Sequence, residues 1–268
     1  HNEICDLWYT GVSVGWCWSA DLNGTRNNHV THNRIHHIVQ RLEDGGGIYC
    51  LGFQPQTVLA NNIIHDSGRD GGRVDCRGIY LDSGCLGFLV ENNLLYDTQG
   101  AALRMQIGTG CNTYLNNIIA FSRKYAIDMD VARSCVFINN IVYLDRGRLF
   151  VYEKWPHYEK YITRNVYWRT DGQPFVFAGQ EWKEWREQRM TPRSYFTGTP
   201  MDAGSLLTDP KFVDAQKRDF RLRPDSPALK VGFKPFDLDE IGLTGDKAWR
   251  TLPSRARVRV PAEEGVGF

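Results

Sequence analysis

The stretch GIYLDSGCLGFLVENNLLYDT, residues 78–98, contains the two patterns that decide the fold. Its first part alternates apolar and polar residues, and its second part places Asn93 directly before an aliphatic pair. The asparagine pattern recurs along the chain in steps of 23 to 31 residues, at Asn2, Asn33, Asn62, Asn93, Asn117, Asn140 and Asn165. Repeats of this length are typical of solenoid folds.

A second apolar alternation follows most of these asparagines, in GVSVGW (from 11), GIYCLG (from 47), ALRMQIG (from 102) and AIDMDV (from 126). Each repeat therefore holds at least two short strands, and no helical pattern separates them, which disfavours a βαβ fold. The sequence predicts an all-β chain, a right-handed parallel β-helix. An asparagine at each corner can adopt left-handed backbone and bond to the asparagine of the next rung. A β-sandwich with asparagine-rich turns is the alternative.

The pattern changes after residue 170. The segment QEWKEWREQRM (180–190) has the spacing of a short surface helix, and 206–233 is expected to close the coil. We therefore predict a β-helix over 1–233 and an extended tail over 234–268, without a second domain. Because HNEICDL at the start already matches the repeat, we expect further rungs upstream, or a partner chain, to cover the first rung.

Composition narrows the possible functions. The 268 residues are 42% hydrophobic, carry a net charge of +1 and contain no apolar run long enough to span a membrane, so neither nucleic acid nor a membrane is an expected partner.

Seven cysteines are an odd number, and we expect most to be buried thiols, with Cys76 and Cys85 bracketing one strand. An export signal is expected upstream, which would make the protein secreted or periplasmic.

Alternation in the strands predicts which side chains face outward. In GIYLD, Ile79 and Leu81 point inward, whereas Tyr80 and Asp82 point outward. The same register produces an outward column of Tyr49, Tyr80, Arg104 and Asp128, and a second of Asp82, Gln106 and Asp130. Asp44 can lean over these columns from its loop, and Trp16, Trp18 and Tyr9 can add an aromatic wall. Rings, carboxylates and amides are what a sugar-binding cleft needs. The alternative is an ordinary solvated face.

Several segments resemble the right-handed β-helix enzymes of glycoside hydrolase family 141: YTGVSVGWCW (9–18), TRNNHVTHNRIHHIVQRLEDGGGIYCLG (25–52) and GIYLDSGCLGFLVENNLLYDT (78–98). The resemblance runs over nearly the whole chain. It implies hydrolysis of fucosidic or xylan linkages by two aspartates, which fall by motif on Asp44 and Asp82. Relatives often carry histidines where this chain has Arg104 and Gln106, and Arg104 would suit a carboxylated or sulfated sugar.

The sequence thus predicts a glycoside hydrolase acting on a plant or algal polysaccharide, with no metal or other cofactor. One alternative is a β-helix polysaccharide lyase, in which Asp128, Asp130 and Arg104 would take part with Ca²⁺. Another is a carbohydrate-binding protein without activity. The G-x-S-x-G pattern around Ser13 lacks the helix that a nucleophile elbow requires. A zinc site in HVTHNRIHH, formed by His29, His32, His36 and His37, is also disfavoured.

Overall fold

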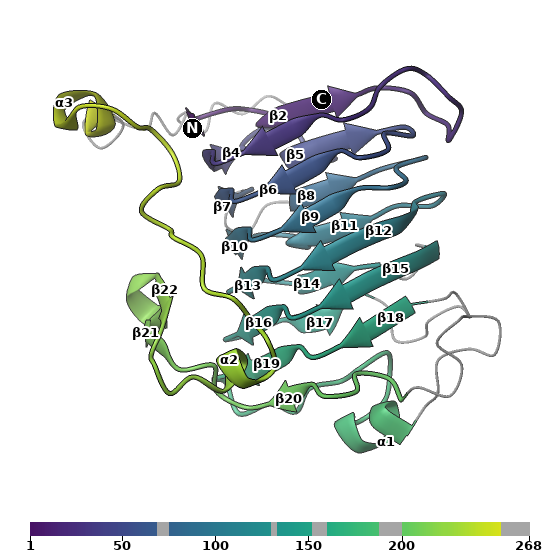
Figure 1. The fold of residues 1–268 in the computed structure, drawn as a ribbon, viewed down its shortest axis with the longest axis vertical. Coiled ribbons are helices and arrows are strands. Elements are labelled where there is room, and N and C mark those ends of the chain that lie inside the picture. Colours follow the sequence, from purple (N-terminus) through teal and green to yellow (C-terminus); the bar gives the residue numbers. More distant parts are fainter. Residues whose placement is uncertain (69–74, 130–132, 152–159, 188–199, 253–268) are drawn as a thin grey trace, which may run out of the picture.

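The computed structural model describes residues 1–68, 75–129, 133–151, 160–187 and 200–252. The chain winds into a parallel β-helix whose rungs stack along the long axis of the molecule (Figure 1). Each full rung contributes one strand to each of three sheets, and every pair of neighbouring strands in these sheets is parallel. The predicted fold class is confirmed.

The first sheet consists of β1 (Glu3–Cys5), β4 (Arg34–Ile38), β7 (Ile63–Ser67), β10 (Leu94–Thr98), β13 (Ile118–Ala120), β16 (Ile141–Leu144), β19 (Val166–Arg169) and β20 (Leu206–Leu207). The second consists of β2 (Val12–Gly15), β5 (Gly45–Leu51), β8 (Cys76–Leu81), β11 (Leu103–Met105), β14 (Tyr125–Asp128) and β17 (Arg148–Phe150). The third consists of β3 (His29–Thr31), β6 (Val58–Ala60), β9 (Leu89–Glu91), β12 (Gly110–Leu115), β15 (Arg133–Ile138) and β18 (Lys160–Thr163).

The interior of the coil is filled by aliphatic side chains that stack in register from rung to rung. In the second sheet, Ile48 pairs with Ile79, Ile79 with Leu103, and Leu103 with Ile127, and all four are buried in one core. Because the register places like residues above one another, each rung extends the same apolar core. The inward direction predicted for Ile79, Leu81, Leu103 and Ile127 is confirmed.

The repeated asparagines form a hydrogen-bonded ladder along one corner of the coil. Asn62 shows the pattern: its backbone N–H and its Nδ2 both donate to Oδ1 of Asn93, at 3.0 Å each. Its own Oδ1 accepts the same two bonds from Asn33, at 3.1 and 3.0 Å. The ladder runs from Asn2 to Asn165, which confirms the predicted bonding between rungs.

The left-handed backbone predicted for these asparagines lies one residue earlier. Positive φ angles occur at the residues that precede the ladder from the second rung onward, namely His32, Asn61, Asn92, Asn116, Asn139 and Arg164. Asparagine adopts this conformation more readily than most residues, which explains its frequency there. The first asparagine of each Asn-Asn pair therefore makes the turn, and the second makes the ladder.

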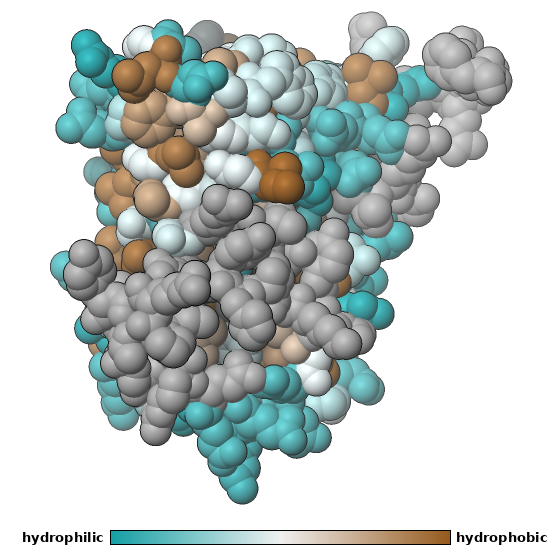
Figure 2. Space-filling view, turned by 90° about the vertical axis from the view of Figure 1, so that its right-hand side faces the viewer, coloured by the Kyte–Doolittle hydropathy of each residue, from teal (hydrophilic) through white to brown (hydrophobic). Residues whose placement is uncertain are grey.

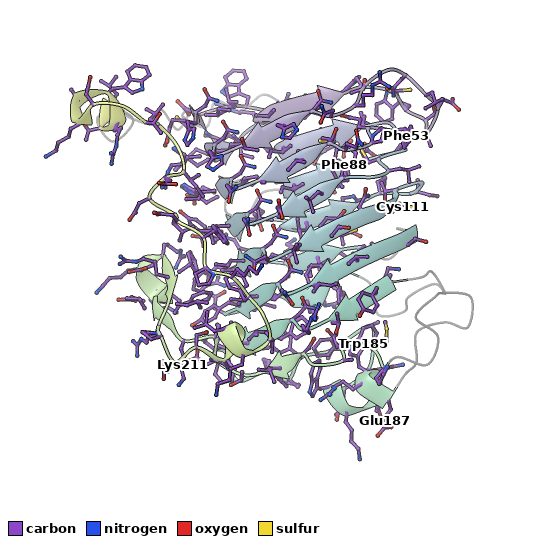
Figure 3. The ribbon with its side chains drawn as sticks, in the orientation of Figure 1. Phe53, Phe88, Cys111, Trp185, Glu187 and Lys211 are labelled. Atoms are coloured by element: carbon purple, nitrogen blue, oxygen red, sulfur yellow. The ribbon has the colours of Figure 1, made fainter. Side chains whose placement is uncertain are left out.

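A buried carboxylate ends the ladder at the lower end of the coil. Asp202 accepts hydrogen bonds from Nε1 of Trp185 (2.7 Å), from the Tyr167 hydroxyl (2.9 Å) and from Oγ of Ser205 (2.8 Å). Ser205 in turn accepts the backbone N–H of Asn165, the last asparagine of the ladder. Trp185 lies in α1 (Trp182–Glu187), and Figure 3 labels it. This is the short helix predicted over 180–190, of which 188–190 lie outside the described residues.

Asp202 should give folding stability a measurable pH dependence. Burial raises the pKa of Asp202 above its ordinary value, although Trp185, Ser205 and Tyr167 donate to it. The folded state therefore favours the protonated carboxyl, so its stabilising contribution is greatest below the unfolded pKa of about 3.9 and falls as pH rises. We expect the free energy of unfolding of the wild type, relative to Asp202→Asn, to decrease from about pH 4 upward. Urea unfolding of both proteins at several pH values measures this difference, and a constant or rising difference would contradict it.

The segment after the coil runs back along its outside. A hairpin of β21 (Phe212–Asp214) and β22 (Asp219–Leu222), joined by a 3₁₀ turn at Ala215–Lys217, is followed by α2 (Pro227–Lys230). The chain then extends past several rungs towards the first one, where the backbone N–H of Gly242 donates to the His32 carbonyl, and it reaches α3 (Lys247–Arg250) (Figure 1). The division at residue 233 stays a prediction, and 253–268 lie outside the described residues.

Two further properties concern the whole molecule. All seven cysteines are free thiols, and Cys50, Cys76, Cys85 and Cys135 are buried, as expected for most of them. None of the helices that the structure describes is long and apolar enough to cross a membrane.

Candidate active site

The second sheet places the predicted column on the outside of the coil. Tyr49 pairs in register with Tyr80, Tyr80 with Arg104, and Arg104 with Asp128. Tyr49 and Tyr80 form a cluster of their own, apart from the core that fills the coil. The predicted direction of this column is therefore confirmed.

The expected solvent exposure of the column is wrong. Tyr49 and Tyr80 are each only 1% exposed, because they stack on each other at 4.4 Å and are covered by further side chains. The Trp16 ring lies 5.0 Å from Tyr49, and the Arg77 guanidinium lies 4.3 Å over the ring of Tyr80. Asp82 and Asp128 are buried as well. The strip is thus a covered layer whose outer surface is formed by other residues.

Asp82 follows β8 directly and is held by three hydrogen-bond donors. The Tyr49 hydroxyl donates to its Oδ2 at 2.5 Å, and the backbone N–H and hydroxyl of Ser83 donate to its Oδ1 at 2.7 and 3.2 Å. Only 3% of the residue is exposed. Tyr49 and Ser83 thus contact both oxygens of Asp82 and fix the position of its side chain.

A loop after β2, residues 16–25, lies beside Asp82 and carries two of the predicted tryptophans. A Cβ added at Gly84, in the turn after Asp82, would lie 2.3 Å from the Ser19 carbonyl oxygen, so loop and turn are in contact. Trp16 and Trp18 are 46% and 63% exposed and meet edge to face at 6.3 Å. They are the predicted binding residues that offer apolar ring surface to solvent.

Asp44 stands on the rim of the same strip. It precedes β5 with a left-handed backbone, and its side chain is 61% exposed. Oδ1 of Asp44 accepts a hydrogen bond from the Arg77 guanidinium at 2.9 Å. The same guanidinium donates to Asp75 at 2.6 Å, and Arg77 itself is buried. One cation therefore bridges two carboxylates on consecutive rungs.

Asp75 is a site residue that sequence reasoning missed. Gly45 pairs in register with Cys76, so Asp44 and Asp75 occupy equivalent positions immediately before successive strands. The signal was present in the sequence, because DGGGIY (44–49) aligns with DCRGIY (75–80). Alignment of these two segments would have placed two carboxylates about one strand spacing, ~4.8 Å, apart.

Arg104, Gln106 and Asp128 hold one another. Arg104 forms an ion pair with Asp128 and donates a second hydrogen bond to Oε1 of Gln106 at 2.9 Å. The Asp128 carboxylate compensates the charge of Arg104, and binding of an anionic sugar by Arg104 stays a prediction. Asp130, the remaining predicted residue, lies outside the described residues.

The charges of Asp44 and Asp82 act on the same aromatic rings. Burial, and then the hydrogen bond to Asp82, raises the pKa of Tyr49 well above its ordinary value, and the charge of Asp44 adds to the effect. Burial also raises the pKa of Tyr80, and both carboxylates contribute to this against the opposing charge of Arg77. The Tyr49 hydroxyl therefore remains a proton donor throughout the neutral range. Contacts across the stacked rings join the two aspartates, which are 38 positions apart in sequence. Asp82 accepts from Tyr49, Tyr80 stacks on Tyr49, and Arg77 lies over Tyr80 and donates to Asp44.

The histidines of HVTHNRIHH lie elsewhere. His29 is in β3 of the third sheet, His32 lies between β3 and β4, and His36 and His37 are in β4 of the first sheet. His36 contacts Glu3 through Nε2 and His37 through Nδ1, each at 2.7 Å, and its ring stacks on His65. Within the part of the chain that the structure describes, no three histidine, cysteine, aspartate or glutamate side chains are grouped so as to hold a metal ion.

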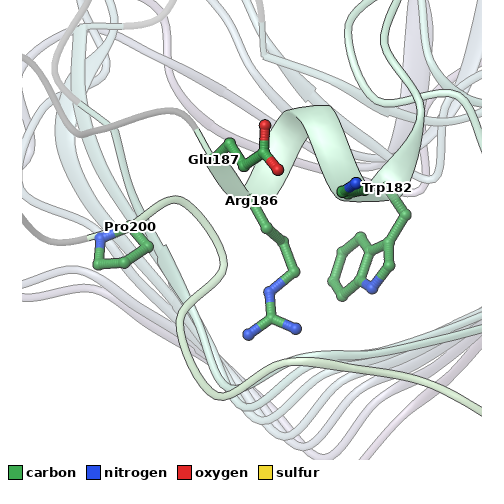
Figure 4. Close-up of a pocket in the computed structure, with 5 residues that line it drawn as sticks. Trp182, Arg186, Glu187 and Pro200 are labelled. Atoms are coloured by element: carbon green, nitrogen blue, oxygen red, sulfur yellow. The ribbon is translucent and has the colours of Figure 1, made fainter.

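Cavities occur away from the strip. One of about 350 Å³ lies beside α1 and is lined by Trp182, Lys183, Arg186, Glu187 and Pro200 (Figure 4). Another, of about 580 Å³, lies between the first sheet and the returning C-terminal segment, and its lining includes Arg34, His65 and Asp239. On the face shown in Figure 2, apolar side chains gather towards the first rungs. None of these cavities contains the Asp44 and Asp82 carboxylates.

Residues 18–143 match a family model described as a right handed beta helix region. The chain contains a right-handed β-helix. The match covers most of the site, including Asp44, Asp82 and Arg104. A search of curated proteins and a search of solved structures gave no match. The right-handed β-helix is common to polysaccharide-degrading enzymes and to proteins that bind polysaccharides.

Proposed function

We propose that the protein is a glycoside hydrolase that cleaves O-glycosidic bonds of a plant or algal polysaccharide outside the cell, using Asp44 and Asp82. The observation that carries the proposal is the chain of contacts from Asp82 through Tyr49, Tyr80 and Arg77 to Asp44. It lies beside the exposed rings of Trp16 and Trp18. The resemblance to glycoside hydrolase family 141 supports it from the sequence.

This combination suits the chemistry of glycoside hydrolysis. The reaction needs one carboxylic acid to protonate the leaving oxygen and one carboxylate to attack the sugar or activate water. Indole rings add a surface on which the C–H face of a sugar can stack. Because only 3% of Asp82 is exposed, the proposal requires loop 16–25 to shift when a sugar enters.

The lyase alternative has less support. A lyase needs a base that removes a proton next to the sugar carboxylate, and the two arginines of the strip are both engaged by acidic partners. Arg104 pairs with Asp128, and Arg77 bridges Asp44 and Asp75. A binding protein without activity would keep the tryptophan surface and needs no paired carboxylates.

Product analysis tests the proposal. The protein is incubated with a panel of aryl glycosides and of plant and algal polysaccharides, and both reducing ends and unsaturated sugars are measured. The proposal expects reducing ends without unsaturated sugars from at least one substrate. Unsaturated products would establish a lyase, and retention of a polysaccharide without any product would establish a binding protein.

A further inference from the structure

The strip carries one phenol that is fully enclosed and points at a proposed catalytic carboxylate. Tyr49 is 1% exposed, stacks on Tyr80 and lies under Trp16, so its hydroxyl has a fixed position. That hydroxyl donates to Oδ2 of Asp82, while Ser83 occupies Oδ1. Both oxygens of Asp82 are therefore held as acceptors.

Unlike Asp82, the two carboxylates at the rim of the strip, Asp44 and Asp75, share a cation. Arg77 is the cation shared by Asp44 and Asp75, and one guanidinium compensates one negative charge. Asp44 is also far more exposed than Asp82 and can reach a leaving-group oxygen from the rim.

We infer that Tyr49 is a positioning residue that holds Asp82 in the orientation of the nucleophile or base, which leaves Asp44 as the acid. This inference rests on the proposed function. Tyr49 does not touch the substrate in this account, which replaces the substrate-binding role predicted for it from sequence. The glycosidic C–O bond breaks as Asp44 gives its proton to the leaving oxygen, while Asp82 either bonds to the anomeric carbon or takes a proton from the water that does so. If Asp82 bonds to the sugar, water then cleaves the resulting ester, and Asp44 regains its proton from that water.

The test compares Tyr49→Phe with Tyr143→Phe. Both changes remove one hydroxyl from a buried ring that packs against other aromatic rings, but Tyr143 lies in β16 of the first sheet, away from the strip. Two aryl glycosides accepted by the wild type are used, one with a good leaving group and one with a poor leaving group. We expect Tyr49→Phe to lower kcat by about 10- to 100-fold, the loss of one hydrogen bond to a charged group, with little change in KM.

The leaving group separates the two roles. Loss of the Asp82 orientation in Tyr49→Phe should lower the rate of hydrolysis of both substrates to a similar degree. Asp44→Asn should have little effect on the rate for the substrate whose leaving group needs no proton. Tyr143→Phe should stay close to the wild type. The inference is overturned if Tyr49→Phe stays within about twofold of the wild type, raises only KM, or matches Tyr143→Phe. A wild type that hydrolyses nothing in the panel overturns the proposed function itself, and this inference with it.

Discussion

Replacing Asp82 by asparagine is expected to lower turnover by about 10²–10⁴-fold, the contribution typical of a positioned catalytic acid or base. Asparagine has nearly the same shape and can still accept from Ser83, while the Tyr49 hydroxyl can rotate to meet the amide. The change removes the negative charge and leaves the packing of β8 intact. Initial rates on the best substrate, measured with circular dichroism of both proteins, check the expectation.

A matched control separates this loss from a general effect of removing a carboxylate. Asp171 follows β19 and pairs with Arg169, far from the second-sheet column. Asp171→Asn should retain the wild-type rate. If Asp82→Asn keeps more than about a tenth of the activity while folding normally, Asp82 is not the carboxylate of the reaction.

The ladder asparagines should have the largest effect on folding. Asn62→Ala removes the acceptor of the Asn33 backbone N–H and the donor to the Val30 carbonyl, and Asn62 is fully buried. An unsatisfied buried group costs about 1–3 kcal/mol, so we expect a loss of about 2–6 kcal/mol in the free energy of unfolding. Urea unfolding measures it directly.

The adjacent residue supplies the control. Asn61 has a φ of 53°, a conformation that glycine adopts without strain. Asn61→Gly should therefore cost less than about 1 kcal/mol. Equal losses at positions 61 and 62 would show that the corner depends on local turn geometry and not on the ladder.

The fold could be predicted because its determinants are periodic. One rung contains its own strands, corner and ladder asparagine, so repetition in the sequence shows the architecture without knowledge of distant contacts. The left-handed residue was misplaced by one position, because both members of an Asn-Asn pair such as Asn92 and Asn93 satisfy the same turn preference. Only the hydrogen bonds distinguish which one makes the ladder.

The site could be predicted only in part. Alternation shows that Tyr49 and Tyr80 leave the coil interior, but it contains no information on what covers them. The covering side chains are Trp16, from a loop on another rung, and Arg77, whose position depends on Asp44 and Asp75. Such contacts between rungs depend on loop conformation, which has no period in the sequence.

Hydrolysis in heavy-oxygen water tests whether this carboxylate strip cleaves glycosidic bonds with water. The products of the most active substrate are analysed by mass spectrometry. We expect one heavy oxygen at the new anomeric hydroxyl, and almost no labelled product from Asp82→Asn. An unsaturated product without the label, or label incorporation at the wild-type rate by Asp82→Asn, would contradict it.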